Sequence, residues 1–129
     1  DKTNDQLINY YLKDIQQELI VKNDINFCSI KINSEPQVLK NIAFKSSKLI
    51  ENLVLIIGSI YQDKVYVVCQ ISKNLTEKKG MDAREINKKI CDEIGGNGGG
   101  QSFFTTASSP NTQKLDGLLN SSEKIVFNS

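Results

Sequence analysis

The sequence predicts an α/β (α+β) domain in which helices pack on a mixed sheet of about four strands, preceded by an N-terminal linker helix. Two observations predict this class. Segments with apolar residues three or four apart, typical of amphipathic helices, alternate with short apolar runs typical of strands. The 129 residues, 39% of them hydrophobic, are enough for one core. The expected order is helix, strand, helix, strand, strand, helix, strand, helix, which implies helices packed on a sheet.

The first predicted helix runs from Asn4 to about Val21. Its apolar stripe recurs every four residues and consists of Leu7, Tyr11, Ile15 and Leu19. Because the chain begins at Asp1 without a methionine, we expect it to be a piece of a longer protein. Residues 1–22 are therefore assigned to a linker helix, the end of a longer helical connection, and residues 23–129 to a globular domain. A helix packed on its own domain is the alternative.

A strand over Ile25–Ile32 and a second helix come next. Ser34 can cap this helix, Pro36 fits its first turn, and Gln37 can complete a capping box. The helical spacing of its apolar residues is given by Leu39, Ile42, Ala43, Leu49 and Ile50.

The centre of the chain predicts an antiparallel hairpin. Leu53–Ile60 is a continuous apolar run, as expected for a central strand that is covered on both faces. Residues 61–64 form a plausible turn, and Val65–Ser72 returns as the second strand. The polar, lysine-rich segment Lys73–Gly80 is expected to be an exposed loop, whose simplest interpretation is a solvated surface segment.

A third helix should start after Asp82, which can cap it, and should end at Gly95, a natural residue for the left-handed C-terminal position. Its buried stripe would consist of Ala83, Ile86, Ile90 and Ile94. A strand is expected over residues 101–106. A last helix should begin at 108–111 and carry three leucines, and residues 124–127 could add a short strand or turn.

The most informative feature is the segment Gly95–Gly100, which holds five of the eight glycines of the chain. Glycine loses much backbone freedom on folding, so such a run indicates a special backbone requirement. One interpretation is a sharp turn that packs against the sheet without a ligand. The other is a concavity of main-chain N–H groups that binds a phosphate. The residues proposed for nucleic-acid binding are Asn97, Gly98, Gly99, Gly100 and Gln101, with added charge from Lys73, Lys78 and Lys79.

Two familiar phosphate-binding motifs do not fit this segment. The dinucleotide motif GxGxxG fails in every register, and it should follow a strand, whereas this run follows a helix. The P-loop motif GxxxxGK[ST] fails because Gln101 stands where the lysine that reaches the β- and γ-phosphates is required. Neither dinucleotide binding nor nucleotide hydrolysis is therefore predicted.

The composition of the chain excludes most catalytic and metal chemistry. The absence of histidine removes His-dependent triads and His-containing zinc sites, and the cysteines at 28, 69 and 91 are too few for a four-thiolate zinc site. We therefore predict no catalytic residue, metal or cofactor here. Three scattered cysteines without a secretory signal fit buried thiols in a reducing, cytoplasmic compartment. No apolar run is long enough for a membrane span.

The charge of the chain limits the kind of nucleic-acid contact. The net charge is +1, and Arg84 is the one arginine among 16 basic residues. Arginine reads bases bidentately, so we expect lysine contacts to phosphate instead. Phe103 and Phe104 offer a stacking surface for a base. The alternative is that at least one of the two rings lies in the core.

The stretch from Ile56 to Val126 resembles the C-terminal domain of alanyl-tRNA synthetases, also called the DHH-associated domain. The resemblance rests on four elements in order. A strand ends in a phrase read here as Ser72-Lys73-Asn74-Leu75-Thr76, and a helix follows. The glycine phrase GGxGGG comes next, and a final helix contains the KLDxxL-like core Lys114-Leu115-Asp116-Gly117-Leu118-Leu119.

The chain departs from the family pattern after the glycines. Many family members have an arginine where this chain has Gln101, and two later glycines are replaced by Ser108 and Ser109. Gln101 can only hydrogen-bond where arginine would add charge. Phosphodiesterase relatives place a histidine after the glycines, and this chain contains none.

The resemblance implies a non-catalytic accessory domain that holds the elbow of tRNA-Ala and supports aminoacylation and editing. Those reactions would belong to upstream domains of the same chain, an alanine–tRNA ligase that uses ATP, Mg and Zn. Two alternatives stay open. The first is the substrate-recognition domain of a DHH-type nucleotide phosphodiesterase, and the second is a purely structural module that forms a homodimer.

Overall fold

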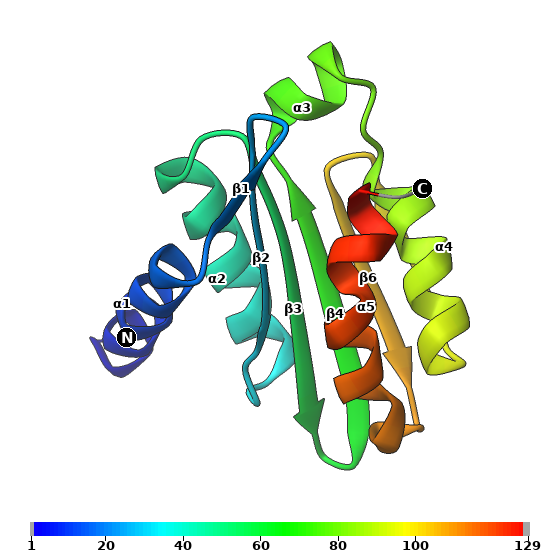
Figure 1. The fold of residues 1–129 in the computed structure, drawn as a ribbon. Coiled ribbons are helices and arrows are strands. Elements are labelled where there is room, and N and C mark those ends of the chain that lie inside the picture. Colours follow the sequence, from blue (N-terminus) through cyan, green and yellow to red (C-terminus); the bar gives the residue numbers. More distant parts are fainter. Residues whose placement is uncertain (1, 128–129) are drawn as a thin grey trace.

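The structure, a computed structural model, describes residues 2–127 and contains a six-stranded mixed sheet (Figure 1). The strands are β1 (Ile20–Lys22), β2 (Ile25–Lys31), β3 (Leu53–Tyr61), β4 (Lys64–Ile71), β5 (Asn97–Gln101) and β6 (Phe104–Ser109). Their spatial order is β1-β2-β3-β4-β6-β5. Only β2 and β3 pair in parallel, and the other neighbours are antiparallel. The predicted α/β class is confirmed, and the sheet has two more strands than the four expected.

Helices cover both faces of this sheet. They are α1 (Lys2–Gln17), α2 (Pro36–Leu49), α3 (Lys73–Lys78), α4 (Ala83–Ile94) and α5 (Leu115–Phe127), with a 3₁₀ turn at Thr112–Lys114. Figure 1 shows α5 in front of the sheet, α2 behind it and α3 beyond one end. The chain therefore has two cores, one on each face of the sheet.

The central strand β3 divides the two cores. Val54 and Ile56 pack with α4 and α5, whereas Leu55 and Ile57 pack with α1 and α2. All four side chains are fully buried. Since successive strand residues point to opposite faces, a strand covered on both sides must be apolar throughout. The continuous run in the sequence is explained by this position.

The first helix ends earlier than expected. It stops at Gln17, and Ile20–Lys22 forms β1 instead of continuing the helix to Val21. Asn23 and Asp24 have φ values of 54° and 63°, as the two-residue turn of a β-hairpin requires. The helix packs on α2 through three buried residues, Ile8, Leu12 and Ile15. The proposed division of the chain at residue 22 stays a prediction.

The start of α2 differs from the predicted capping box. Its N-cap residue is Glu35, without a side-chain cap hydrogen bond, and the Gln37 amide donates to Asn41. Ser34 instead binds a neighbouring strand: its N–H donates to Ser59 Oγ, and the Ser59 hydroxyl donates to the Ser34 carbonyl. Pro36 lies in the first turn as predicted.

Four expectations for the second half of the chain are wrong. The segment expected as a loop forms the short helix α3, held by the buried Leu75. The last strand is shifted to Phe104–Ser109, so α5 begins at Leu115 and not at 108–111. Residues 124–127 are the last turn of α5. The turn at 61–64 is confirmed, because Gln62 and Asp63 have positive φ angles.

Both predicted ends of α4 are confirmed. Gly95 adopts the left-handed conformation, with φ 63° and ψ 44°. The Asp82 carboxylate accepts from the backbone N–H of Arg84 at 2.9 Å and binds its guanidinium at 2.7 Å. These Arg84 hydrogen bonds lower the pKa of Asp82.

We predict that Asp82→Ala lowers the free energy of unfolding at pH 7 by about 1 kcal/mol, the usual cost of a lost N-cap. Because the pKa of Asp82 is lower in the folded state, its contribution is present above the unfolded pKa of about 3.9. It is lost as pH falls through the folded pKa. Urea unfolding of the unchanged chain and of Asp82→Ala should show that their difference in free energy of unfolding is smaller at pH 3 than at pH 7. An equal difference at both values would contradict the assignment, and Asp82→Asn serves as the uncharged cap control.

Candidate nucleic-acid interface

The glycine run forms an edge strand of the sheet and not a loop. Asn97–Gln101 is β5, which pairs antiparallel with β6, Gly99 lying opposite Thr106. All five residues are exposed. Because β5 is the last strand of the sheet, one side of its backbone pairs with β6 and the other presents unpaired N–H and C=O groups. Main-chain donors are thus accessible along this edge.

Three of the glycines are required by the close approach of β6. A Cβ on Gly96, Gly98 or Gly100 would collide with a backbone carbonyl oxygen of β6. A Cβ on Gly99 would meet no atom within 4 Å. The packing explanation of the run therefore applies to alternate glycines, whereas Gly99 lies beside open space.

A hollow of about 550 Å³ lies between β5 and α4. The glycine strand lines one wall, and one face of α4 lines the other with Arg84, Asn87, Lys88, Cys91 and Asp92. Asn87 is 4% exposed, and its amide donates to the Thr106 carbonyl at 3.2 Å. Its Oδ1 has no hydrogen-bond partner among the described residues. A buried acceptor without a hydrogen-bond partner is costly.

Of the predicted site residues, the structure brings Asn97, Gly98, Gly99 and Gly100 together in this hollow, and Gln101 continues the same strand. The three predicted lysines lie elsewhere. Lys73 Nζ is 5.4 Å from the centre of the Phe103 ring, and Lys79 Nζ donates to the Asn23 carbonyl at 2.8 Å. Lys78 is exposed in the last turn of α3.

The basic residues that do line the hollow, Arg84 and Lys88, were missed by sequence reasoning. Their signal was available, because Arg84, Asn87, Lys88 and Cys91 are spaced as one face of the helix that runs directly into the glycines. Because β5 follows α4 after a short turn and runs back along it, this face of the helix lies beside the strand. Arg84 is partly neutralised by its ion pair with Asp82, so Lys88 is the less constrained cation.

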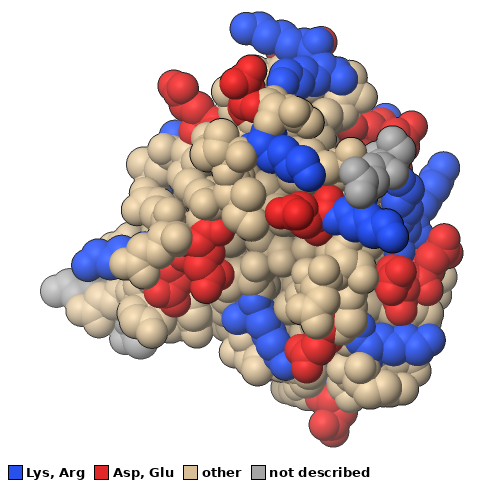
Figure 2. Space-filling model, in the orientation of Figure 1, with Lys and Arg blue, Asp and Glu red and all other residues tan. Residues whose placement is uncertain are grey.

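Charge on the surface is mixed. Figure 2 shows basic side chains gathered at the upper end of the molecule, over α3, and basic and acidic side chains interspersed over the rest of that face. The formal net charge is only +1. Phosphate affinity grows with the number of cations engaged, so this arrangement supports weak electrostatic binding.

The two phenylalanines of the predicted stacking surface separate. Phe104 packs against Phe44 at the edge of the α1–α2 core, with 5.0 Å between the ring centres. Phe103 lies in the turn between β5 and β6 and lines a second groove of about 700 Å³. One ring therefore packs against the core, as expected, and the other lies outside it; both side chains are half-buried.

The cysteines are not placed for reaction. Burial raises the pKa of Cys28 and of Cys69 to about 12, and it raises the pKa of the half-buried Cys91. Thiols with raised pKa values are poor nucleophiles at neutral pH. Within residues 2–127, no group of three or more His, Cys, Asp or Glu residues could hold a metal ion. No described helix is long and apolar enough to cross a membrane.

Comparison with known proteins identifies relatives of this chain. Residues 8–127 match the DHHA1 domain family. The alanine–tRNA ligase of Christiangramia forsetii is 31% identical over 112 residues, which are 87% of this chain and 13% of that ligase. The alanine–tRNA ligase of Bacteroides thetaiotaomicron is 36% identical over 116 residues, 89% of this chain and 12% of the ligase. The chain thus spans about an eighth of the length of these relatives.

Two solved structures share the fold. The C-Ala domain of Aquifex aeolicus alanyl-tRNA synthetase matches with a TM-score of 0.70 and 21% identity, covering 84% of this chain and 96% of that domain. A DHH domain from a member of the s1p family of ribosomal proteins matches with a TM-score of 0.56 and 15% identity. It covers 93% of this chain and 30% of the other.

A matched pair of glycine substitutions tests the packing of β5. We predict that Gly98→Ala lowers the free energy of unfolding by about 1–3 kcal/mol, because the new methyl group must displace the backbone of β6. Gly99→Ala should change it by less than about 0.5 kcal/mol, since its Cβ enters open space. Urea unfolding of the two variants measures both values. Equal losses would show that β5 does not lie against β6 in this register.

Proposed function

The chain belongs to the DHHA1 domain family, as its resemblance predicted, and we propose that it is the tRNA-binding C-terminal domain of an alanine–tRNA ligase. The observation that carries this proposal is the similarity of nearly the whole chain to a segment of alanine–tRNA ligases. Aminoacylation and editing, with their ATP, Mg and Zn, then belong to other domains of the same polypeptide. The compartment proposed is the cytoplasm.

The proposed contacts are main-chain amides and lysines. Asn97, Gly98, Gly99, Gly100 and Gln101 would face the phosphate backbone of tRNA-Ala along the open edge of β5. Folded RNA is recognised largely by shape and by backbone contacts, for which amides without side chains and flexible lysines are suited. Lys73, Lys78 and Lys79 stay in the proposed interface, with Lys88 added because it lines the hollow.

The weak charge is consistent with a tethered role. A domain with a net charge of +1 engages few phosphates, so its own affinity for RNA should be low. Attachment to catalytic domains that bind the other end of the tRNA raises the effective concentration and the overall affinity. The elbow of tRNA, distant from the acceptor end, is the part such an attached domain would hold.

The nucleotide phosphodiesterase alternative is less well supported. Its relatives place a histidine after the glycines, whereas this chain has no histidine at any position. The position directly after the glycines is taken by Gln101, the last residue of β5.

Binding to intact tRNA-Ala should be stronger than binding to a minihelix that carries the acceptor stem but lacks the elbow. We expect a measurable difference in Kd at about 50 mM salt, where electrostatic contacts are least screened. Fluorescence titration of the chain with both RNAs measures it. Equal Kd values would exclude the elbow as the part of the tRNA that is bound.

Reversal of two charges at the end of α3 tests the lysine contribution. Lys78→Glu combined with Lys79→Glu should weaken tRNA binding and reduce the slope of log Kd against log salt by roughly 1–2, about one unit for each phosphate that is no longer neutralised. The charge-matched control is Lys13→Glu with Lys45→Glu, on exposed positions of α1 and α2. An identical slope for both double variants would show that α3 is not part of the RNA-binding surface.

A further inference from the structure

The second groove holds a buried amide without a full set of partners. It lies between α2, the end of β4 and the start of α3, with a volume of about 700 Å³, within the range of ligand sites. Gln70 lies at its base and is only 4% exposed. Its Oε1 has no partner among the described residues, and its Nε2 reaches the Ile71 carbonyl at 3.5 Å, the limit of a hydrogen bond.

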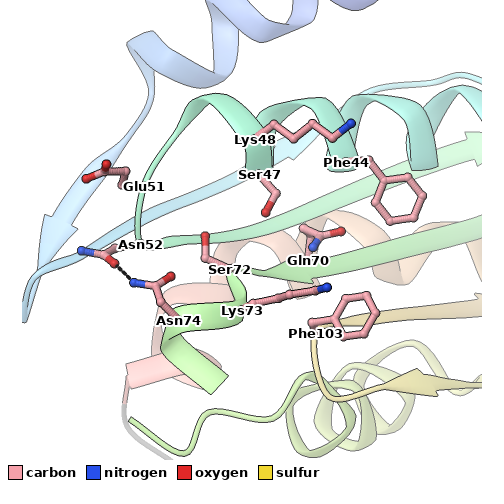
Figure 3. A pocket seen from close by; sticks show the side chains of 10 residues that line it. All are labelled: Phe44, Ser47, Lys48, Glu51, Asn52, Gln70, Ser72, Lys73, Asn74 and Phe103. Carbon is pink, nitrogen blue, oxygen red and sulfur yellow. Dashed lines mark hydrogen bonds between the residues drawn. The ribbon is translucent and has the colours of Figure 1, made fainter. Parts of the chain in front are cut away.

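Aromatic rings flank this amide. Figure 3 shows the Gln70 amide between the rings of Phe44 and Phe103, which come from α2 and from the β5–β6 turn. Phe44 is 42% exposed, unusual for phenylalanine, and Phe103 is half-buried. A planar ligand in the groove would therefore meet aromatic rings together with a hydrogen-bonding amide.

Positive charge lies at the mouth of the groove. Lys48 reaches over it from α2 and Lys73 from α3, and Lys73 Nζ lies above the Phe103 ring (Figure 3). Glu51 is the acidic residue of the lining, and its side chain points away from Gln70. Two lysines beside aromatic rings match the chemistry of a base attached to a phosphate backbone.

We propose that this groove binds one unpaired nucleobase of a single-stranded RNA segment. The base stacks on Phe103 in place of the Lys73 ammonium group, with Phe44 along its other side. Its edge donates an N–H to Gln70 Oε1 and accepts from Gln70 Nε2, as an amide pairs with a base. The flanking phosphates contact Lys48 and Lys73. The proposal rests on the RNA-binding function proposed above and assigns to it a site on the opposite face of the sheet from the hollow beside α4.

The test uses the 129-residue chain and two single-stranded probes, hexauridylate and hexaadenylate, titrated by fluorescence anisotropy. The unchanged chain should bind at least one probe at low salt. Phe103→Ala should raise the Kd roughly five- to hundredfold, the effect of losing one stacked base. Failure of both probes to bind, or an unchanged Kd in Phe103→Ala, would overturn the proposal.

Gln70→Leu separates binding from folding. Replacement of a buried, unsatisfied amide by an apolar side chain of similar size should leave the urea midpoint unchanged or raise it, while hexanucleotide binding falls at least about tenfold. Gln16→Leu, at an exposed position of α1, is the matched control and should alter neither. A lowered midpoint with unchanged binding would show that Gln70 is purely structural and would overturn the proposal.

The same binding measurements, together with those on tRNA-Ala and the minihelix, distinguish this proposal from the proposed function. If tRNA-Ala binds and neither hexanucleotide does, the base site is wrong and the tRNA-binding function stands. If a hexanucleotide binds in a Phe103-dependent way while tRNA-Ala and the minihelix bind equally, the base site stands and the elbow-binding function is wrong.

Discussion

The candidate interface follows from the close approach between the backbones of β5 and β6. Side chains on Gly96, Gly98 or Gly100 would collide with carbonyl oxygens of β6, so the edge strand can pair here only because these residues have none. The same absence of side chains leaves the outer edge of β5 bare. A packing requirement and an accessible row of main-chain groups therefore arise from one feature of the sequence, and the two interpretations of the glycine run are not exclusive.

Two hollows flank the part of the sheet formed by β4, β6 and β5. One lies beside α4, and the other lies beside α2 on the opposite face. Each contains a buried side-chain oxygen without a partner among the described residues, Asn87 Oδ1 in the first and Gln70 Oε1 in the second. Unsatisfied buried acceptors cost about 1–3 kcal/mol each. Lysines lie beside both openings, Lys88 at the first and Lys48 and Lys73 at the second.

Much of the fold could be predicted because its signals are local. The largely apolar run of β3 indicated burial on both faces, and the cap at Asp82 and the left-handed Gly95 fixed the ends of α4. The edge strands could not be predicted in this way. Glycine has no side chain to show a period of two and is depleted in strands, so Gly98–Gly100 resembled a loop. The three residues of β1 continue the apolar pattern of α1, and only the turn at Asn23 and Asp24 separates them from β2.

The candidate site was predicted in part, because the glycines were evident from composition but the position of a long side chain depends on tertiary contacts. Lys79 binds the carbonyl of Asn23, 56 residues away in sequence. Gln70 was hidden inside an apolar strand, where one polar residue gives no signal until its surroundings are known.

Hydrogen exchange of the backbone amides, with and without tRNA-Ala, is the decisive measurement for the edge formed by β5. In the free chain, amides of β5 that face away from β6 should exchange fast, because water reaches the edge of the sheet. We expect tRNA-Ala to slow exchange at Asn97–Gln101 while amides at the β1 edge stay unchanged. Protection confined to other surfaces, with β5 exchanging as fast as in the free chain, would contradict a role for these amides in RNA binding.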